Sequence, residues 1–543
     1  MIRWLAVVGV LGTGAGAAVL GVALSWWWWL LAVPLLAIGV LGLRDLAQRE
    51  HSILRNYPVI GHARYAMESV RPELQQYFIE LNTTGTPFDR ETRGLVYARA
   101  KGEEDARPFG TEREVNAIGY EFVTHSMKAK IAAGAIPSVT VGSGQCAQPY
   151  EMSLLNVSAM SFGSLSANAI EALNAGAAMG GFLHDTGEGA ISPYHLKHGG
   201  DLNWEIASGY FGCRTSGGQF DADQFEQKAR GETVKTISIK LSQGAKPGLG
   251  GVLPGAKVSE EIAHTRGVEI GKTVVSPPAH PAFDTPRELI RFIEQLRALS
   301  GGKPVGIKLC VGSRHEFLAI CKAMVEQESY PDFIIVDGSE GGTGAGPVEF
   351  EDHMGMPLTE GLIFVHNALT GVGLRGQVKI GVSGKIATGV DIVKRICQGA
   401  DFTLSARAMM FAIGCIQAQA CHTNRCPVGV ATQDPKRARA LDVGIKSERV
   451  RNFQTQTVAS AHQIVTSMGL ESFTELHPGL LYRRQDHQIT ETYADLHEWL
   501  SPCQLLDDPP ETWISDWELA DPDTFGHRVS NRPPGFHPEV FER

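Results

Sequence analysis

The sequence is poor in cysteine and has no excess of positive charge. Its nine cysteines in 543 residues are too few, and odd in number, for a disulfide framework. Lysine and arginine total 49 against 59 acidic residues, and a net charge of −10 gives no footprint for nucleic-acid binding. Hydrophobic residues make up 43% and charged residues 20%, which excludes a disordered or collagen-like chain. At about 100–200 residues per domain, we expect roughly two to four structural units.

Charged side chains are missing from one long stretch near the N-terminus, residues 4–43 between Arg3 and Arg44. As one helix it would be about 60 Å long, twice the ~30 Å hydrocarbon core of a bilayer, so we expect two crossings that turn near Ser25. The indole rings of Trp26–Trp29 would then lie at the far interface. The basic residues at the two ends predict an inner-membrane protein whose later domains face the cytoplasm. A cleaved signal peptide is the alternative, although its apolar region spans only about 7–15 residues.

Composition divides the chain into four parts. Residues 1–45 form the expected transmembrane hairpin, and residues 46–130 are charged and interrupted by prolines, which predicts a connector with short helices. Residues 131–470 carry the chemical motifs described below. Residues 471–543 are acidic and rich in tryptophan and proline, and we expect a wrapping or loosely ordered tail.

Short apolar runs alternate with amphipathic segments between about residues 150 and 420. In the segment 285–301, Leu289, Ile293 and Leu296 follow the spacing of a helix that buries one face. Eight runs read as strands: 153–160, 181–187, 235–242, 272–277, 304–310, 332–338, 378–384 and 400–406. Eight strands alternating with helices over about 250 residues predict an α/β protein with a (β/α)8 TIM barrel, and a doubly wound sheet is the alternative.

Glycine-rich segments follow several of these runs, at the barrel end where active sites form. Gly381, Gly384, Thr388 and Gly389 suit a phosphate site, because glycine lets backbone N–H groups approach the phosphate. The glycine run 338–346 lacks the G-x-G-x-x-G spacing of a Rossmann fingerprint. Together these loops indicate a phosphorylated cofactor.

Three of the cysteines cluster late in the chain, in the sequence Cys415-IQAQA-Cys421-HTNR-Cys426-PVG. Three buried cysteines that only pack are one explanation. Zinc is a second, but His422 directly follows Cys421 and is poorly placed as a fourth ligand. A thiolate cluster that ends in Cys-Pro is typical of iron–sulfur ligation, and three ligands without an obvious fourth favour a three-iron cluster.

Several long motifs resemble the synthase domain of glutamate synthases, in particular the stand-alone, FMN-binding glutamate synthase family. They are MSFGSLS, DTGEG, QGAKPGLGG, SPPAH, GGTGAGP and GCIQAQACHTNRCPVGVATQDP. The resemblance covers roughly residues 110–470, with the motifs in the family's order. It implies an FMN-binding barrel that carries a [3Fe–4S] cluster and forms glutamate by reductive amination of 2-oxoglutarate.

The resemblance also implies roles for individual residues. It implies that Cys415, Cys421 and Cys426 ligate the cluster. Gln243, Lys246 and Arg266 match the groups that hold the 2-oxoglutarate carboxylates. Glu188 matches the active-site glutamate, and Lys308 would be a second catalytic residue beside the flavin pyrimidine. The residues that match flavin-site segments are Ser158, Ser161, Lys308, Asp337, Gly338, Thr343, Gly381 and Gly384.

The chain also departs from the large glutamate synthases. It begins MIRWLAV, without the N-terminal cysteine of their glutaminase domain, and no convincing NAD(P)H-binding unit follows the barrel. We therefore expect free ammonia or a partner amidotransferase as the nitrogen source, and ferredoxin or a separate reductase as the electron donor. Glu340 stands where the large enzymes have an aspartate beside GGTG, so the flavin's surroundings are expected to differ.

Two other functions stay open beside the synthase. One is a membrane-tethered electron-transfer subunit with FMN and an iron–sulfur cluster. The other is an enzyme similar to N-methylglutamate synthase that acts with a partner. The intact QGAKPG motif and Arg266 favour the synthase, because an electron carrier has no need to bind a dicarboxylate.

Overall fold

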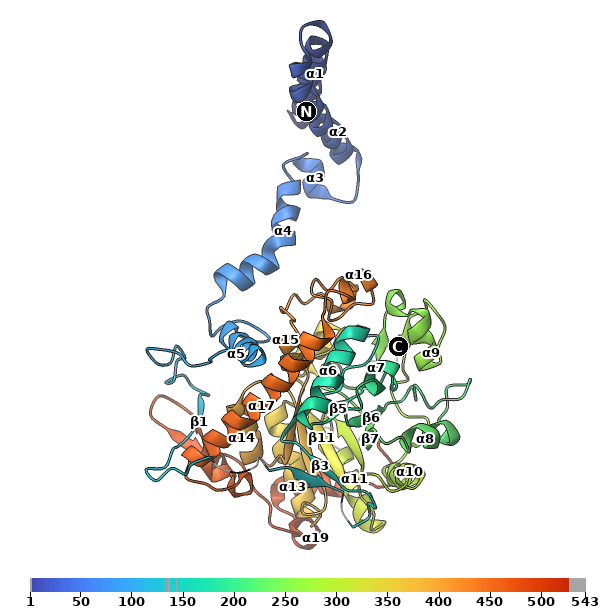
Figure 1. Cartoon of the computed structure of the whole chain (residues 1–543), viewed down its shortest axis with the longest axis vertical. Helices are drawn as coiled ribbons and strands as arrows, with labels where there is room; N and C mark the ends of the chain where they lie inside the picture. The colour runs from blue at the N-terminus through green and yellow to red at the C-terminus, as the bar shows by residue number, and fades with distance from the viewer. Residues whose placement is uncertain (1, 133, 135–136, 143, 527–543) are drawn as a thin grey trace, which may run out of the picture. The chain divides into compact units, whose positions relative to one another are not determined.

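The computed structural model describes residues 2–132, 134, 137–142 and 144–526. The chain forms two compact units, Met1–Thr86 and Pro87–Arg543. Figure 1 shows the first unit in blue as a series of helices, and the second as strands surrounded by helices.

The N-terminal unit begins with two apolar helices, α1 (Ile2–Ala23) and α2 (Trp29–Ala47), joined through the 3-10 turn η1 (Trp26–Trp28). Glycines let the two helices approach closely, since a Cβ added at Gly39 would lie 2.3 Å from a methyl carbon of Leu11. Each helix is long and apolar enough to cross a membrane, a test of length and composition that a signal sequence near an N-terminus also passes.

Shorter helices complete this unit: α3 (Ser52–Asn56), α4 (His62–Leu74) and the π-helical turn η2 (Gln75–Ile79). The carboxylate of Asp45, at the end of α2, is buried and holds the turn between α3 and α4. It accepts a hydrogen bond from the backbone N–H of Val59 at 2.8 Å and lies 2.9 Å from Nε2 of His62.

Eight parallel strands close into a barrel in the C-terminal unit, which confirms the predicted architecture and excludes the doubly wound sheet. The strands follow one another around the barrel in chain order, and the last pairs with the first. They are β4 (Leu155–Val157), β5 (His184–Asp185), β6 (Leu202–Ile206), β7 (Val234–Lys240), β10 (Val305–Leu309), β11 (Phe333–Asp337), β12 (Lys379–Ser383) and β13 (Phe402–Ser405).

The expected strand 272–277 is wrong as a barrel strand. Its central residues form β9 (Val274–Val275), which pairs antiparallel with β8 (Val252–Leu253) in an excursion between β7 and β10. The missing barrel strand is β6, with the sequence LNWEI. β6 is polar at every second position, yet Asn203 and Glu205 are buried, and the strand has no exposed face. Because of these polar residues, β6 does not form an apolar run and was not predicted as a barrel strand.

Helices cover the outside of the barrel (Figure 1). The segment 285–301 forms α10 (Pro286–Leu299), which starts at the N-cap Thr285 and buries Leu289, Ile293 and Leu296, as predicted. Other helices beside the strands are α6 (Ala167–Gly180), α8 (Ala222–Ala229), α11 (Arg314–Glu326), α13 (Leu358–Gly371), α14 (Gly389–Cys397) and α15 (Arg407–Ala412). The long helix α17 (Val443–Ser467) packs against α6, α14 and α5 (Arg90–Lys101).

A small hairpin closes the amino end of the barrel. It consists of β2 (Val139–Val141) and β3 (Tyr150–Met152), and it packs on a cluster of apolar side chains inside the barrel. Phe333 and Phe402, at the start of their strands, belong to this cluster. The barrel interior is therefore filled at this end, which leaves the opposite end for polar side chains.

The remaining elements lie at the edges of the barrel. β1 (Glu121–Val123), β14 (Leu481–Arg484) and β15 (Thr490–Thr492) form an antiparallel sheet that joins the segment before the barrel to the tail. The short helices and turns are α7 (Pro193–Leu196), η3 (Gly255–Lys257), α9 (Glu260–Arg266), α12 (Val348–His353), η4 (Cys421–Thr423), α16 (Pro435–Ala438), η5 (Phe473–Glu475), η6 (Pro478–Leu480), α18 (Tyr493–Leu496), α19 (Gln504–Asp507) and α20 (Glu511–Leu519).

Candidate active site

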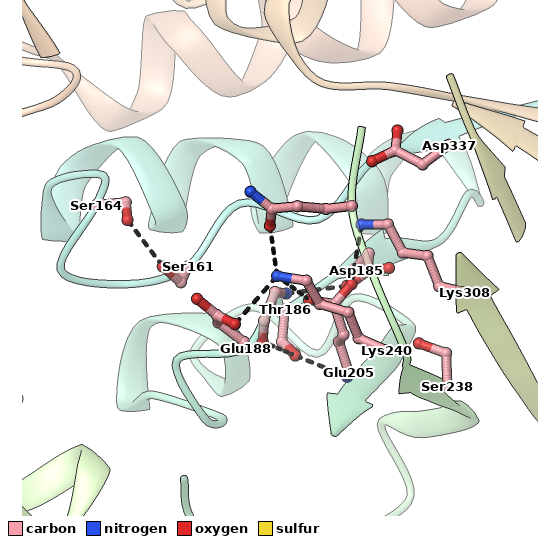
Figure 2. Close-up of polar contacts among 12 residues, drawn as sticks. Ser161, Ser164, Asp185, Thr186, Glu188, Glu205, Ser238, Lys240, Lys308 and Asp337 are labelled. Carbon is pink, nitrogen blue, oxygen red and sulfur yellow. Dashed lines mark hydrogen bonds and ion pairs between the residues drawn. The ribbon is translucent and has the colours of Figure 1, made fainter. Parts of the chain in front are cut away.

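Charged side chains of opposite sign meet near the carboxyl ends of the barrel strands (Figure 2). Lys308 on β10 donates a hydrogen bond to Glu205 on β6 at 3.0 Å. Lys240, the last residue of β7, donates to Glu188 at 3.0 Å and to the amide oxygen of Gln243 at 2.5 Å. Its Nζ also lies 4.0 Å from the other oxygen of Glu205. Glu188, Lys240, Glu205 and Lys308 therefore form a row of alternating charge.

This row keeps its outer members ionised. Although burial alone favours the neutral amine, the charges of Glu205, Asp337 and Asp185 raise the pKa of Lys308 above its usual value. Burial likewise favours the neutral acid at Glu188, but the charge of Lys240 and its hydrogen bond lower the pKa of that carboxyl below its usual value. At neutral pH, Glu188 is thus a carboxylate and Lys308 an ammonium.

A network of polar groups that includes Asp185 supports the row from inside the barrel. Asn203 donates to Asp185 at 2.9 Å and to the hydroxyl of Ser238 at 2.7 Å, and accepts from Thr236 at 2.9 Å. Burial, followed by the charge of Glu205, raises the pKa of Asp185 to about 7. The interior of the barrel is therefore polar near the charged row, and its polar side chains are fixed by hydrogen bonds to one another.

Arg266 and Lys246 are two further cations near Glu188, and both are buried. Arg266 ends α9, and its guanidinium donates to the carbonyl oxygen of Phe162 at 2.9 Å and to the hydroxyl of Ser161 at 3.2 Å. Its buried Nε has no hydrogen-bond partner among the residues that the structure describes. The charges of Arg266 and Lys246 both contribute to the low pKa of Glu188. The structure thus brings two candidate substrate-binding residues, Lys246 and Arg266, close to the candidate catalytic residue Glu188.

Glycines allow the loops around this cluster to approach one another. A Cβ at Gly251 would lie 1.7 Å from a carboxylate oxygen of Glu188, and one at Gly244 would lie 1.8 Å from the carbonyl oxygen of Gly338. The backbone N–H of Gly244 donates to Asp337 at 2.9 Å. The QGAKPG loop after β7 therefore contacts Asp337, the last residue of β11, and the loop that follows it, which contains the candidate flavin residues Gly338 and Thr343.

The other candidate flavin residues lie at the ends of β4 and β12. The hydroxyls of Ser158 and Ser383 are 3.0 Å apart, and Ser161 lies in the loop after β4. Gly384 follows β12 with φ of 153°. Gly381 lies within β12, and a Cβ there would come within 2.4 Å of the ring of Phe402, so the interior packing accounts for this glycine.

The segment after β12 contains the expected phosphate residues and one that was missed. Thr388 caps α14 in a capping box with Asp391, and a Cβ at Gly389 would lie 2.6 Å from the backbone nitrogen of Ala461 on α17. Helix capping and helix packing therefore account for Thr388 and Gly389. The missed residue is Lys385, whose φ of 53° is in the left-handed region.

Arg407, just after β13, is a second cation at this edge that the sequence search did not select. Its guanidinium donates to the carbonyl oxygen of Glu340 at 2.9 Å, and a Cβ at Gly342 would lie 2.9 Å from its Nε. Burial lowers the pKa of Lys385, and the positive charge of Arg407 lowers it further, so each cation acts on the other. The sequence SARAMM places this arginine directly after an apolar strand, a position typical of active-site residues in barrels, so Arg407 could have been predicted.

The three clustered cysteines lie in the loop between α15 and α16, and all are free thiols. Three residues of this loop, Gln417, Gln419 and Asn424, have positive φ. Burial raises the pKa of Cys415 to about 12, and the charges of the other two cysteines contribute to the shift. Within the described residues, no group of three histidine, cysteine or acidic side chains has the geometry of a single-ion site. The three thiols are a donor set suited to a larger iron–sulfur unit.

Comparison with known proteins identifies the family. The family model described as the conserved region in glutamate synthase matches residues 124–471, more than half of the chain. The chain belongs to the glutamate synthase family.

Relatives in this family match different shares of the chain. Glutamate synthase large subunit-like protein YerD of Bacillus subtilis is 37% identical over 516 residues, which are 87% of this chain and 97% of that protein. The archaeal-type NADPH glutamate synthase of Thermotoga maritima is 34% identical over 321 residues, which are 59% of this chain and 60% of its own length. Among solved structures, mandelate oxidase with benzoyl-formic acid has a TM-score of 0.39 at 15% identity, over 74% of this chain and 96% of that one.

Two charged residues of this glutamate synthase-like site were not predicted from the sequence. Lys240 lies in the predicted strand KTISIKLS, and Glu205 lies in the strand that was missed. Each is a charged residue near the carboxyl end of a buried barrel strand, which is a position typical of catalytic side chains. That signal could have found Lys240, whereas Glu205 needed the correct strand order first.

Proposed function

We propose that this chain catalyses the reductive amination of 2-oxoglutarate to glutamate, with FMN and a [3Fe–4S] cluster as its cofactors. Membership of the glutamate synthase family supports the reaction class. The observation that carries the substrate is the pair of buried cations Arg266 and Lys246. Neither forms an ion pair within the described part of the chain, and Glu188, whose charge acts on both, is already paired with Lys240. Burying an unpaired ion costs several kcal/mol, so a dicarboxylate that supplies both counter-charges would be bound strongly.

The clamp would fix the substrate through both of its ends. Lys246 and Arg266 would each bind one carboxylate by charge-assisted hydrogen bonds. Gln243 accepts a hydrogen bond from Lys240 through its amide oxygen, which leaves its amide N–H groups as donors toward a third oxygen. This arrangement would orient C2 of the substrate and exclude water from it.

Glu188 would handle the proton at the reacting nitrogen. Its low pKa keeps it a carboxylate at neutral pH, able to accept a proton from ammonium or from the amine that adds to the ketone. Lys240 positions this carboxylate at 3.0 Å and is itself held near Glu205. The row of alternating charge would thus keep the base ionised while the substrate enters.

The residues present fit FMN. Ser158, Asp337 and Lys308 lie at or near the carboxyl ends of β4, β11 and β10. Arg407 and Lys385 provide two cations for the phosphate, and Gly384 provides a backbone position without a side chain. Bound FMN would supply a hydride to C2 of the imine. The ammonium of Lys308 would stabilise negative charge on the flavin pyrimidine.

The three thiols of Cys415, Cys421 and Cys426 would hold the [3Fe–4S] cluster, through which electrons would enter from ferredoxin or a separate reductase. Ammonia would come from solution or from a partner amidotransferase. The apolar helices α1 and α2 would anchor the chain in the inner membrane, with the catalytic unit in the cytoplasm.

The test is to purify the protein, reduce it anaerobically with dithionite, and add 2-oxoglutarate with ammonium. We expect the flavin to be reoxidised and glutamate to accumulate in equal amount. If neither occurs at any ammonium concentration, the ammonia-dependent enzyme is wrong. Reoxidation only with a primary amine such as methylamine would indicate an N-methylglutamate-type reaction, and reoxidation only by an acceptor protein would indicate an electron-transfer subunit.

A further inference from the structure

Lys257 is a buried lysine that the proposed chemistry does not use. It ends the turn η3 in the excursion after the QGAKPG loop, and only 4% of its surface is exposed. Its Nζ donates to the carbonyl oxygen of Ser164 at 3.1 Å and to that of Ala431 at 3.4 Å. Lys257 therefore joins the loop after β4 to the segment that follows Cys426.

No carboxylate neutralises this ammonium. Within the described residues Lys257 forms no ion pair, and its two recorded hydrogen-bond partners are neutral carbonyls. Burial lowers the pKa of Lys257, and the charges of Cys421 and Cys426 act in the opposite direction. A buried cation without an anion is unfavourable, so the site is built for a negative group at the cysteine loop.

We propose that Lys257 is the counter-charge of the iron–sulfur cluster and raises its reduction potential. The inference rests on the proposed function, because it requires the three cysteines to hold the cluster. One-electron reduction adds one negative charge to the cluster and makes or breaks no bond. A fixed ammonium nearby stabilises the reduced form more than the oxidised form, and local charge is one of the factors that set such potentials.

The chain offers a matched control in Lys303. It is also buried, at 6% exposed, and its Nζ donates to the carbonyl oxygens of Ala229 and Gly231, both at 2.7 Å. The charge of no cysteine acts on it. Lys303→Met therefore removes the same kind of buried cation and the same kind of contacts without touching the cysteine loop.

The experiment is an anaerobic potentiometric titration of the full-length protein with dithionite, followed by the EPR signal of the cluster. At the potential where half of the wild-type clusters are reduced, we expect the ratio of reduced to oxidised cluster in Lys257→Met to fall about tenfold, which is 59 mV for one electron. Lys257→Arg, which keeps the charge, and the control Lys303→Met should both titrate like the wild type.

Each outcome separates this inference from the function it rests on. A wild-type protein without iron and sulfide refutes the cluster itself, and with it the role of Lys257. Full iron content with an unchanged midpoint in Lys257→Met refutes only the role of Lys257. If Lys257→Met loses the cluster, Lys257→Arg decides: retention with a wild-type midpoint supports a role of charge, and equal loss shows that Lys257 only packs the loop.

Discussion

Removing the Lys246 ammonium should weaken the use of 2-oxoglutarate without unfolding the protein. Lys246 is 4% exposed, and its Nζ donates a long hydrogen bond of 3.4 Å to the carbonyl oxygen of Ala345. Burial lowers its pKa, which shows that the ammonium is held at a cost in free energy. Lys246→Ala therefore loses little that stabilises the fold, and we expect its melting temperature to stay within a few degrees of the wild type.

The loss should appear in catalysis instead. A hydrogen bond between charged groups contributes about 1.5–3 kcal/mol, so Lys246→Ala should lower kcat/KM for 2-oxoglutarate by about ten- to a hundredfold. The assay is the rate of reoxidation of dithionite-reduced flavin by 2-oxoglutarate and saturating ammonium, with flavin and iron content measured in parallel. Lys272→Ala is the control, because Lys272 lies in the same excursion, its side chain is 71% exposed, and it pairs with the exposed Glu269.

If the wild type reacts and Lys246→Ala reacts equally fast, the clamp is wrong even though the family is right. A loss of flavin together with activity would point to a structural role in the loop, since Lys246 is not assigned to the phosphate or to the cluster.

Four further predictions concern other parts of the chain. Replacing any one of the three loop cysteines, Cys415, Cys421 or Cys426, by serine should abolish bound iron and sulfide, whereas Cys503→Ser should retain both; unchanged iron in all three variants would contradict the assignment. The full-length protein should sediment with membranes and need detergent, and deletion of residues 1–45 should release a soluble flavoprotein; a full-length protein that is soluble without detergent would show that the apolar helices are not a membrane anchor. Glu188→Gln should lower kcat far more than it raises KM for 2-oxoglutarate, because a proton acceptor is lost while the clamp remains; equal effects on both constants would assign Glu188 to binding. Burial lowers the pKa of His184 to about 3, so its contribution to stability is complete above about pH 6.5 and is lost as the pH falls toward 3; His184→Phe should flatten the acid side of the plot of melting temperature against pH, and an unchanged slope would place the titration elsewhere.

The barrel could be predicted from the sequence because most of its strands are buried on both faces and read as apolar runs. β11, with the sequence FIIVD, is such a run, and each of its residues is buried. β6 could not be found in this way, because Asn203 and Glu205 alternate with apolar residues and point toward the polar end of the interior. The excursion strand β9 has the opposite property, since its two valines are apolar yet exposed to different degrees and pair only with β8.

The candidate site was predictable only in part, for a related reason. Motifs of the family pointed to Glu188, Lys246 and Arg266, and the structure brings these residues together. Lys240 and Glu205 belong to no motif that had been assigned a function, and their importance depends on which strands are neighbours. A side chain on β7 reaches one on β6 only because the barrel places these strands side by side, with Ile239 opposite Ile206.

The order of the strands also explains how the row of alternating charge can be buried inside the barrel. Each lysine is bounded by carboxylates from β6 or from the turn after β5: Lys308 by Glu205, and Lys240 by Glu188 and Glu205. Removing Glu205 would take away the ion-pair partner of Lys308 and one of the two carboxylates near Lys240, whereas removing Lys308 would leave Glu205 near Lys240. Since an unpaired buried ion is more costly than a missing pair, Glu205 should be the least replaceable member of the row, although it belongs to none of the motifs that identify the family.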